Sequence, residues 1–343
     1  MTLTQIVNAF GAFYLGSGKA AEANRTRLFN KLFQPSITAS YFMVEPTNAT
    51  KWRATRAFMT RVLQPFQKDW TPLNGVEFKP KEFDLYKMKV DMEEQPDDLE
   101  PTYVGFLTRL ANETNQSIEN LMRTSWPFVR WYIEEYLINQ MQEDLEMNEI
   151  FWGEFVAPTP GTPGAIGTTM DGINKILNDG RTSGSTVIQT TGALQTATPA
   201  DFVEQIEDFV EGVFNSDPFN KLRSQDFMLF MRSYNFDRYL RGFRDKYGKE
   251  TDQSTLKRNT IDGKPNITIA ALPSMDAHPT TGVGSNKIWM SASKNMIRPT
   301  IFGKNMEQIQ TKLANNPRTV QFWTDSWMAV NFIIDEAVAV NEL

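Results

Sequence analysis

The sequence contains no cysteine and only one histidine, His278. The missing thiols exclude disulfides, cysteine nucleophiles, zinc–thiolate sites and iron–sulfur clusters. A Ser-His-Asp triad would have to combine His278 with its neighbours Ser274 and Asp276. The three share one loop bounded by Pro273 and Pro279, whereas a triad is assembled by the fold rather than by adjacency. We therefore interpret His278 as a solvated loop residue and predict no zinc or iron site.

An apolar run of the roughly 20 residues that span a bilayer is also missing. Residues 1–15 lack the basic start and the small-residue cleavage site of a signal peptide. Acidic residues outnumber basic ones by 41 to 35, which gives a net charge of −6. An acidic chain is poorly suited to wrapping nucleic acid by neutralising phosphates. We therefore expect no membrane partner and no sequence-specific contact with nucleic acid.

Complete phosphate-binding motifs are absent as well. Gly16-Ser17-Gly18-Lys19 is preceded by Phe13 where a phosphate loop has its first glycine, and Ala20 replaces the hydroxyl residue. Gly282-Val283-Gly284 lacks the third glycine of a dinucleotide fingerprint. We interpret the first stretch as part of a flexible arm and predict no nucleotide cofactor.

Carboxylates are plentiful, but their spacing does not indicate catalysis. Glu134 and Glu135 could be taken for a glycosidase pair, yet adjacent positions on a helix point in different directions. Arg130, four residues before Glu134, offers an ion pair instead. The acidic segment from Glu93 to Glu100 lacks the ligand spacing of an EF-hand. We predict no catalytic residue, no cofactor and no metal.

Hydrophobic residues nevertheless make up 41% of the chain and include 24 phenylalanines, which is enough for a sizeable core. Residues 1–40 contribute little to that core, because they are rich in small and polar residues. We predict that they form an arm, with Arg25 and Arg27 in its basic part, and that the arm lies on another surface.

Residues 41–95 predict an extended hairpin. From Tyr86 to Met92, apolar residues alternate with charged ones, as on a strand with one buried face, and we interpret this run as the return strand. Prolines and turn residues interrupt the upstream part. Such a long, interrupted segment is hard to bury within one domain, so we expect it to project. Trp52 and Trp70 lie in it and are predicted to contact another subunit.

The strongest helical pattern runs from Pro127 to about Asn148, where large apolar residues recur every four positions. A helix of that length is roughly 30 Å long. A proline- and glycine-rich linker over 158–167 follows, and then a mixture of helices and strands without a regular βαβ period. The predicted fold class is therefore α+β. An arm and a hairpin that cannot cover their own apolar faces indicate assembly with further copies.

This order of elements resembles the major capsid proteins of tailed bacteriophages, which have the Hong Kong 97-like fold. Two local stretches, Ile267–Met275 and Asp325–Asn341, are similar to capsid proteins of phages of Bacteroidetes-type hosts. The resemblance implies five segments, namely an N-terminal arm (1–40), an extended loop (41–95), a peripheral domain with a long spine helix (96–159, helix about 127–148), an axial domain (160–290) and return strands that complete both domains (291–343).

The resemblance also implies a function. The chain would self-assemble into hexamers and pentamers of an icosahedral or prolate shell that encloses double-stranded DNA. It would be assembled in the host cytoplasm and reside in the virion, with a portal and minor capsid proteins as partners. Residues 1–40 are too short for the family's cleaved scaffolding extension, so we expect a separate scaffolding protein, or assembly without one. An encapsulin-type compartment shell remains an alternative, and a carboxylate-based hydrolase is the second alternative.

Opposite charges suggest where subunits meet. We hypothesise that an acidic turn from Glu93 to Glu100 pairs across subunits with basic residues of the arm and the extended loop. The predicted inter-subunit contacts are Trp52, Arg53, Arg56, Arg61, Trp70, Asp97, Asp98, Arg25 and Arg27.

Overall fold

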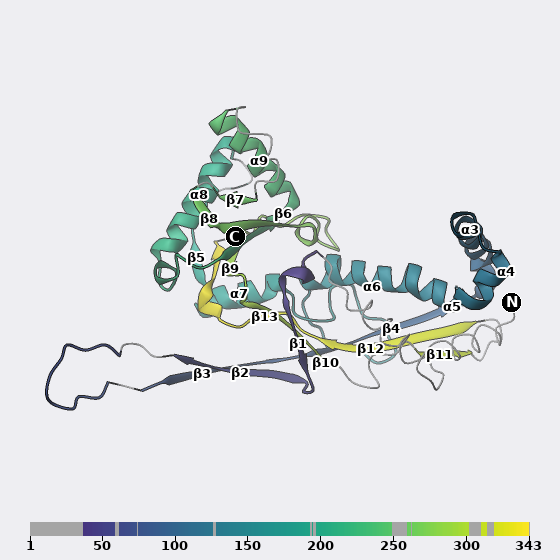
Figure 1. The fold of residues 1–343 in the computed structure, drawn as a ribbon, viewed down its shortest axis with the longest axis horizontal. Coiled ribbons are helices and arrows are strands. Elements are labelled where there is room, and N and C mark those ends of the chain that lie inside the picture. The colour runs from purple at the N-terminus through teal and green to yellow at the C-terminus, as the bar shows by residue number, and fades with distance from the viewer. Residues whose placement is uncertain are drawn as a thin grey trace.

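The computed structural model describes residues 37–58, 62–73, 75–125, 128–192, 194, 197–248, 259–261, 263–301, 310–313 and 319–342. Most of the predicted arm, with Arg25 and Arg27, lies outside the described residues, as does Arg61. Figure 1 shows a long body, a domain of helices and sheet that rises from it, and a thin hairpin that extends beyond the body.

A long helix lies along one sheet and forms the body (Figure 1). The strand order is β1-β10-β12-β11, with β4 added along β12 and β13 paired with β10. Strands β4 and β12 pair antiparallel over their full length, from Tyr86 opposite Met328 to Glu94 opposite Val320. The bounds of the six strands are β1 (Met43–Thr47), β4 (Tyr86–Glu94), β10 (Met296–Ile301), β11 (Gln310–Leu313), β12 (Val320–Met328) and β13 (Asn331–Phe332).

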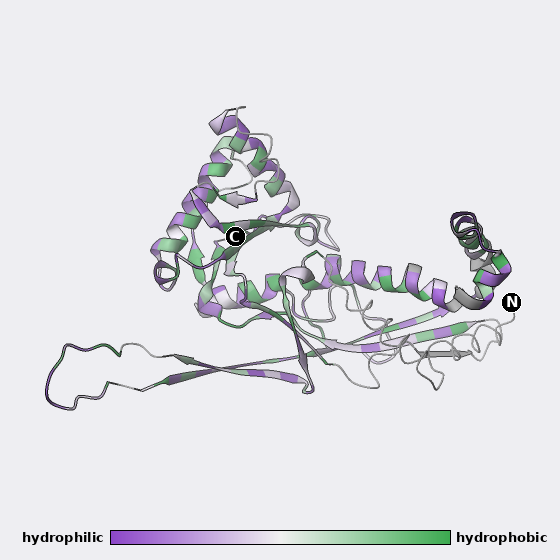
Figure 2. Cartoon of the chain, viewed as in Figure 1, coloured by the Kyte–Doolittle hydropathy of each residue, from purple (hydrophilic) through white to green (hydrophobic). Residues whose placement is uncertain are grey.

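The predicted spine helix is present and consists of α-helical and π-helical stretches in succession. Its buried stripe includes Trp131, Ile133 and Leu137, which pack with Val320 and Phe322 of β12. Figure 2 shows hydrophilic and hydrophobic residues alternating along it, as expected for a helix with one covered face. The successive segments are α5 (Phe128–Trp131), η4 (Tyr132–Leu137), α6 (Ile138–Asp144) and η5 (Leu145–Ile150), and α3 (Pro96–Thr114), α4 (Ile118–Asn120) and η3 (Leu121–Ser125) precede them.

The second domain is built on a separate sheet with the strand order β5-β14-β9-β6-β8-β7. Two helices cover it, and the first begins at a complete capping box, in which Thr198 accepts from Asp201 N and the Asp201 side chain accepts from Thr198 N. The predicted strand at Phe227–Met231 is central and buried. The elements are α7 (Ile173–Ser183), β5 (Val187–Gln189), α8 (Pro199–Asn215), β6 (Phe227–Arg232), α9 (Ser233–Tyr247), β7 (Thr260–Ile261), β8 (Lys264–Leu272), β9 (Trp289–Ala292) and β14 (Val338–Asn341).

The hairpin consists of β2 (Lys51–Phe58) and β3 (Glu77–Asp84), which pair antiparallel with each other. This corrects the interpretation of Tyr86–Met92 as the return strand, because β3 returns the hairpin and β4 joins the body sheet. Only one residue, Leu85, separates the two strands, and its N–H donates to the carbonyl of Thr50 at the base of the hairpin (2.8 Å). The apolar face of β4 packs beneath the spine helix.

The acidic segment also differs from its prediction. Glu93 and Glu94 end β4, and α3 begins at Pro96, so Asp97 and Asp98 lie in the first turn of a helix rather than in an open turn. The side chains of Glu93 and Glu94 already bind within the chain, to Gln321 and Tyr132 respectively.

Candidate interaction surface

The tip of the hairpin presents large apolar side chains to solvent. Leu63, Phe66 and Trp70 are 84%, 95% and 91% exposed. The loop that carries them is closed by Gln64, whose amide donates to the carbonyl of Thr71 (2.7 Å) and accepts from the Thr71 hydroxyl (3.0 Å). Scattered exposed apolar residues are ordinary on a protein surface, but three large ones between residues 63 and 70 of one loop make this tip a candidate contact surface.

Trp52 is buried, whereas Trp70 in the same hairpin is exposed. Its side chain is only 6% exposed and stacks on Phe83 of the opposite strand, with ring centroids 5.0 Å apart. The indole N–H donates to Glu45 (2.9 Å). Trp52 therefore belongs to the apolar cluster at the base of the hairpin, and we do not retain it as a contact between subunits.

The two predicted arginines of strand β2 point to opposite sides of the hairpin. Arg53 pairs with Glu82 through Nε (2.7 Å) and keeps 71% of its side chain exposed. Arg56 pairs with Glu336, which lies in a short turn near the end of the chain (3.0 Å). Sequence analysis did not identify Glu336, because 280 residues separate the two and no local pattern connects them.

A buried cluster fixes the first described residues to the spine helix. The N–H of Thr38 donates to both carboxylate oxygens of Glu146, at 2.9 and 3.1 Å, and the Thr38 hydroxyl also donates to this carboxylate. The hydroxyls of Thr38 and Ser274 are 2.9 Å apart. This cluster, which sequence analysis missed, holds the point from which the chain enters the body sheet.

Ser274, Asp276 and His278, the candidate Ser-His-Asp triad, each make contacts with other parts of the chain. Ser274 is fully buried beside Thr38, and Asp276 accepts from the N–H of Tyr234 (3.2 Å). His278 is half-buried rather than fully solvated, because its ring packs edge-on against Trp152. The Nδ1 of His278 accepts two hydrogen bonds, one from the backbone N–H of Thr280 and one from that of Thr281.

The predicted ion pair on the spine helix is present. Arg130 Nε lies 3.3 Å from Glu134 Oε1, and the Glu134 side chain is only 4% exposed. Within the described ranges, no group of His, Cys, Asp or Glu could hold a metal ion. Searching those same residues, we find no helix that is long and apolar enough to cross a membrane.

One cavity lies where the hairpin base meets α7. Its volume is about 330 Å³, and Tyr86, Asp171, Asp179 and Asp335 are among its lining residues. The Tyr86 hydroxyl donates to Asp171 (2.6 Å), and burial together with this bond raises the pKa of Tyr86. Asp335 is paired with Lys81. Both of these carboxylates therefore serve structural contacts.

No family model and no curated protein matches the chain. Solved structures do match. One is the capsid of the Myoviridae phage XM1, with a TM-score of 0.51 and 11% identity over 90% of this chain and 92% of that chain. Another is the satellite phage P4 procapsid including its size determination (Sid) protein, with a TM-score of 0.52 and 8% identity over 100% of this chain and 98% of that chain. The predicted α+β capsid fold is therefore confirmed, whereas the suggested host class stays a prediction.

Proposed function

We propose that this chain is a major capsid protein that self-assembles into hexamers and pentamers of an icosahedral or prolate shell around double-stranded DNA. The observation that carries the proposal is the exposed apolar tip of the hairpin, on a chain that has a phage capsid fold. Each large apolar side chain removed from water contributes roughly 1.5–3 kcal/mol. Phe66 and Trp70 would gain this by packing on a neighbouring copy.

Each segment of the chain would have its own role in assembly. Residues 1–40 would act as an arm that ties neighbours together, and the extended loop (41–95) would lie over the next subunit. The peripheral domain (96–159), the axial domain (160–290) and the return strands (291–343) would form the shell itself. The Thr38–Glu146 cluster supports this division, because it gives the arm a rigid point of departure.

The remaining partners follow from the same proposal. The role is structural rather than enzymatic, and the partners are further copies, a separate scaffolding protein, a portal and minor capsid proteins. A net charge of −6 suits a shell that encloses DNA without trapping it. The location would be the virion, after assembly in the host cytoplasm.

Electron microscopy of negatively stained protein, together with mass photometry, tests the proposal. The full chain is expressed alone and with any scaffolding protein encoded beside its gene. We expect closed shells or hexameric rings. A stable monomer under all conditions would contradict the proposal, and substrate turnover by that monomer would favour the carboxylate-based hydrolase. Shells filled with a protein cargo instead of DNA would favour the encapsulin-type alternative.

Charge pairing between subunits is a separate part of the proposal. Asp97 and Asp98 would pair with Arg25, Arg27 or Arg61 of a neighbour, since Arg53 and Arg56 already have carboxylate partners in their own chain. Changing Asp97 and Asp98 to Asn should weaken assembly and lower its resistance to salt, because screening weakens exposed ion pairs. Assembly and salt resistance equal to those of the wild type would exclude this pairing.

A further inference from the structure

Strand pairing with the body does not set the direction of the hairpin. Strands β2 and β3 pair with each other and, within the described residues, with no other strand. An isolated two-stranded ribbon is marginally stable by itself and can bend at its base. Besides the covalent link to β4 through Leu85, side-chain contacts with the body therefore help to determine the angle at which this ribbon leaves it.

One face of the hairpin carries a series of side chains that contact the body. The strand register places Trp52 opposite Phe83, Ala54 opposite Lys81, and Arg56 opposite Lys79. Directly opposed residues share a face, and every second pair does so again. The face therefore begins with an apolar pair at the base and continues with three cations. The apolar pair packs with residues of β10 and with Ala329.

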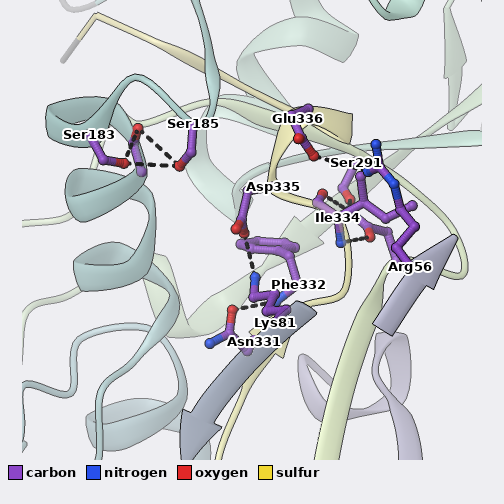
Figure 3. A network of polar contacts seen from close by, with 12 residues as sticks. Arg56, Lys81, Ser183, Ser185, Ser291, Asn331, Phe332, Ile334, Asp335 and Glu336 are labelled. Atoms are coloured by element: carbon purple, nitrogen blue, oxygen red, sulfur yellow. Dashed lines mark hydrogen bonds and ion pairs between the residues drawn. The ribbon is translucent and has the colours of Figure 1, made fainter. Parts of the chain in front are cut away.

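The three cations converge on two adjacent carboxylates of the body. Arg56 Nη1 and Lys79 Nζ lie 3.0 and 3.4 Å from the carboxylate oxygens of Glu336, and Lys81 Nζ lies 2.5 Å from Asp335 Oδ1. Figure 3 shows Arg56 and Lys81 of the hairpin facing Glu336 and Asp335. We call these five residues the hairpin clamp.

The other face of the hairpin is neutralised within the hairpin itself. Lys51 pairs with Glu82 and Asp84 (3.1 and 3.2 Å), and Arg53 pairs with Glu82 (2.7 Å). A change in the angle of the hairpin leaves these ion pairs intact, because both partners of each pair belong to the hairpin. The clamp is different, since its anions belong to the body and its cations to the hairpin.

The acidic half of the clamp sits on a braced turn. Asp335 and Glu336 begin the short helix η9 (Asp335–Ala337) between β13 and β14. The turn is held by the buried Asn295, whose Oδ1 accepts from the N–H of Ile334 (2.8 Å) and whose amide donates to the Ile334 carbonyl (2.9 Å). Burial opposes ionisation of Glu336, but its backbone hydrogen bond together with Arg56 and Lys79 outweighs burial and lowers its pKa.

We propose that Asp335 and Glu336 are positioning residues that fix the angle of the hairpin and thereby the place at which its apolar tip meets a neighbouring copy. Two anions and three cations spread over two strands resist rotation as well as separation. A single apolar contact at the base would act only as a pivot. The consequence for neighbouring copies rests on the proposed capsid function, whereas the effect on the hairpin angle can be tested without it.

Pulsed electron spin resonance on the full chain measures a distance between two labels that changes with this angle. Since the sequence has no cysteine, Glu77→Cys on β3 and Glu211→Cys on α8 provide two exposed labelling points. Labelled protein is mixed with an excess of unlabelled chain, so that only distances within one chain are recorded. The test variant is Asp335→Asn with Glu336→Gln. The matched control is Asp325→Asn, which removes an ion pair with Lys87 inside the body sheet (2.8 Å).

We expect one narrow distance distribution for the wild type and the control, and a broadened or shifted one for the test variant. Salt near 1 M, where the screening length is about 3 Å, should broaden the wild-type distribution. Reversing both acids to Lys should shift the mean further, and adding Arg56→Glu, Lys79→Glu and Lys81→Glu should restore it. A test variant that matches the control would overturn the proposal and assign the angle to the apolar cluster and the backbone link at Leu85.

The diameter of the assembled shells provides a second, independent test of the hairpin clamp. If the clamp positions the tip, the test variant should form shells of mixed diameter or none, with an unchanged thermal unfolding temperature. Uniform shells from a variant whose hairpin is demonstrably free would overturn the link to assembly. If the wild type forms no shells, the capsid proposal fails while the spin-label distances still decide the role of the clamp.

Discussion

Aromatic residues of the hairpin serve two purposes that depend on their place along it. Trp52 and Phe83 at the base bury their rings against the body, whereas Phe66 and Trp70 at the tip remain in water. Substitutions in the pair at the base should therefore change the stability of the fold. Substitutions in the pair at the tip should change the association of subunits. Substitutions at single positions separate these effects.

Changing Phe66 and Trp70 to Ala should abolish shell assembly and leave the unfolding temperature unchanged. Truncation of anchor residues at an interface costs about 2 kcal/mol or more each in binding free energy. Negative-stain microscopy and thermal unfolding measure the two outcomes. Lys68→Ala at an exposed position of the same loop is the matched control, and Trp52→Ala should instead destabilise the fold by about 3–5 kcal/mol. Normal shells from the tip variant would contradict this prediction.

Lys287 should make stability depend on pH. Burial, together with the nearby Arg181, lowers the pKa of Lys287 to about 8. The folded chain then releases this proton near pH 8 and the unfolded chain near pH 10.4. Because the unfolded chain binds more protons between these values, the free energy of unfolding should rise by roughly 2 kcal/mol from pH 7.5 to 9.5.

Urea unfolding across that range measures the slope. Lys287→Met should remove the rise, although it also leaves Asn174 and Asn178 without their ammonium donor. The exposed Lys294→Met should keep the wild-type slope. Equal slopes in the two variants would show that Lys287 is not the source.

At the scale of elements, the Thr38–Glu146 cluster joins three parts of the chain. The spine helix provides the carboxylate, the segment before β1 provides Thr38, and the turn after β8 provides Ser274. All three side chains are buried. The position at which the arm leaves the body is thus tied to the element that spans the body.

Thr38→Val should weaken this junction, because only the backbone N–H at position 38 would still donate to Glu146. The substitution keeps the side-chain volume but removes the hydroxyl that Glu146 and Ser274 share, and loss of a buried partner costs about 1–3 kcal/mol. We expect a lower unfolding temperature and faster proteolysis within residues 37–42. Thr47→Val on the half-exposed β1 is the control and should be neutral. Unchanged proteolysis would show that the junction is held by other contacts.

At the scale of the whole molecule, the two sheet domains contain the large buried clusters, and no described residue of the hairpin tip belongs to one. The chain should therefore tolerate removal of the tip. Phe58 lies directly opposite Glu77, so an Asn-Gly turn can replace residues 59–76 and close the strands as a two-residue hairpin.

This shortened chain should fold with an unchanged unfolding temperature and form no shells. Circular dichroism measures the first outcome and mass photometry the second. Shell formation by the shortened chain would exclude the tip as an assembly contact. Loss of folding would show that the tip contributes to the stability of its own chain.

The sequence alone determined the features whose physical causes are local. The spine helix follows from its four-residue apolar repeat, and β6 follows from a short apolar run. The start of α8 follows from Thr198 and Pro199, because a cap and its proline act within a single turn. The order of such elements was also enough to predict the α+β capsid fold.

Only the tertiary structure decided which elements and side chains meet. The alternation from Tyr86 to Met92 is the same whether the strand pairs with the hairpin or with β12, since one face is buried in either case. Trp52 and Trp70 are equally apolar, and the register and the position along the hairpin determine which one is buried. Contacts such as Arg56–Glu336 join residues 280 positions apart, and no periodicity spans that distance.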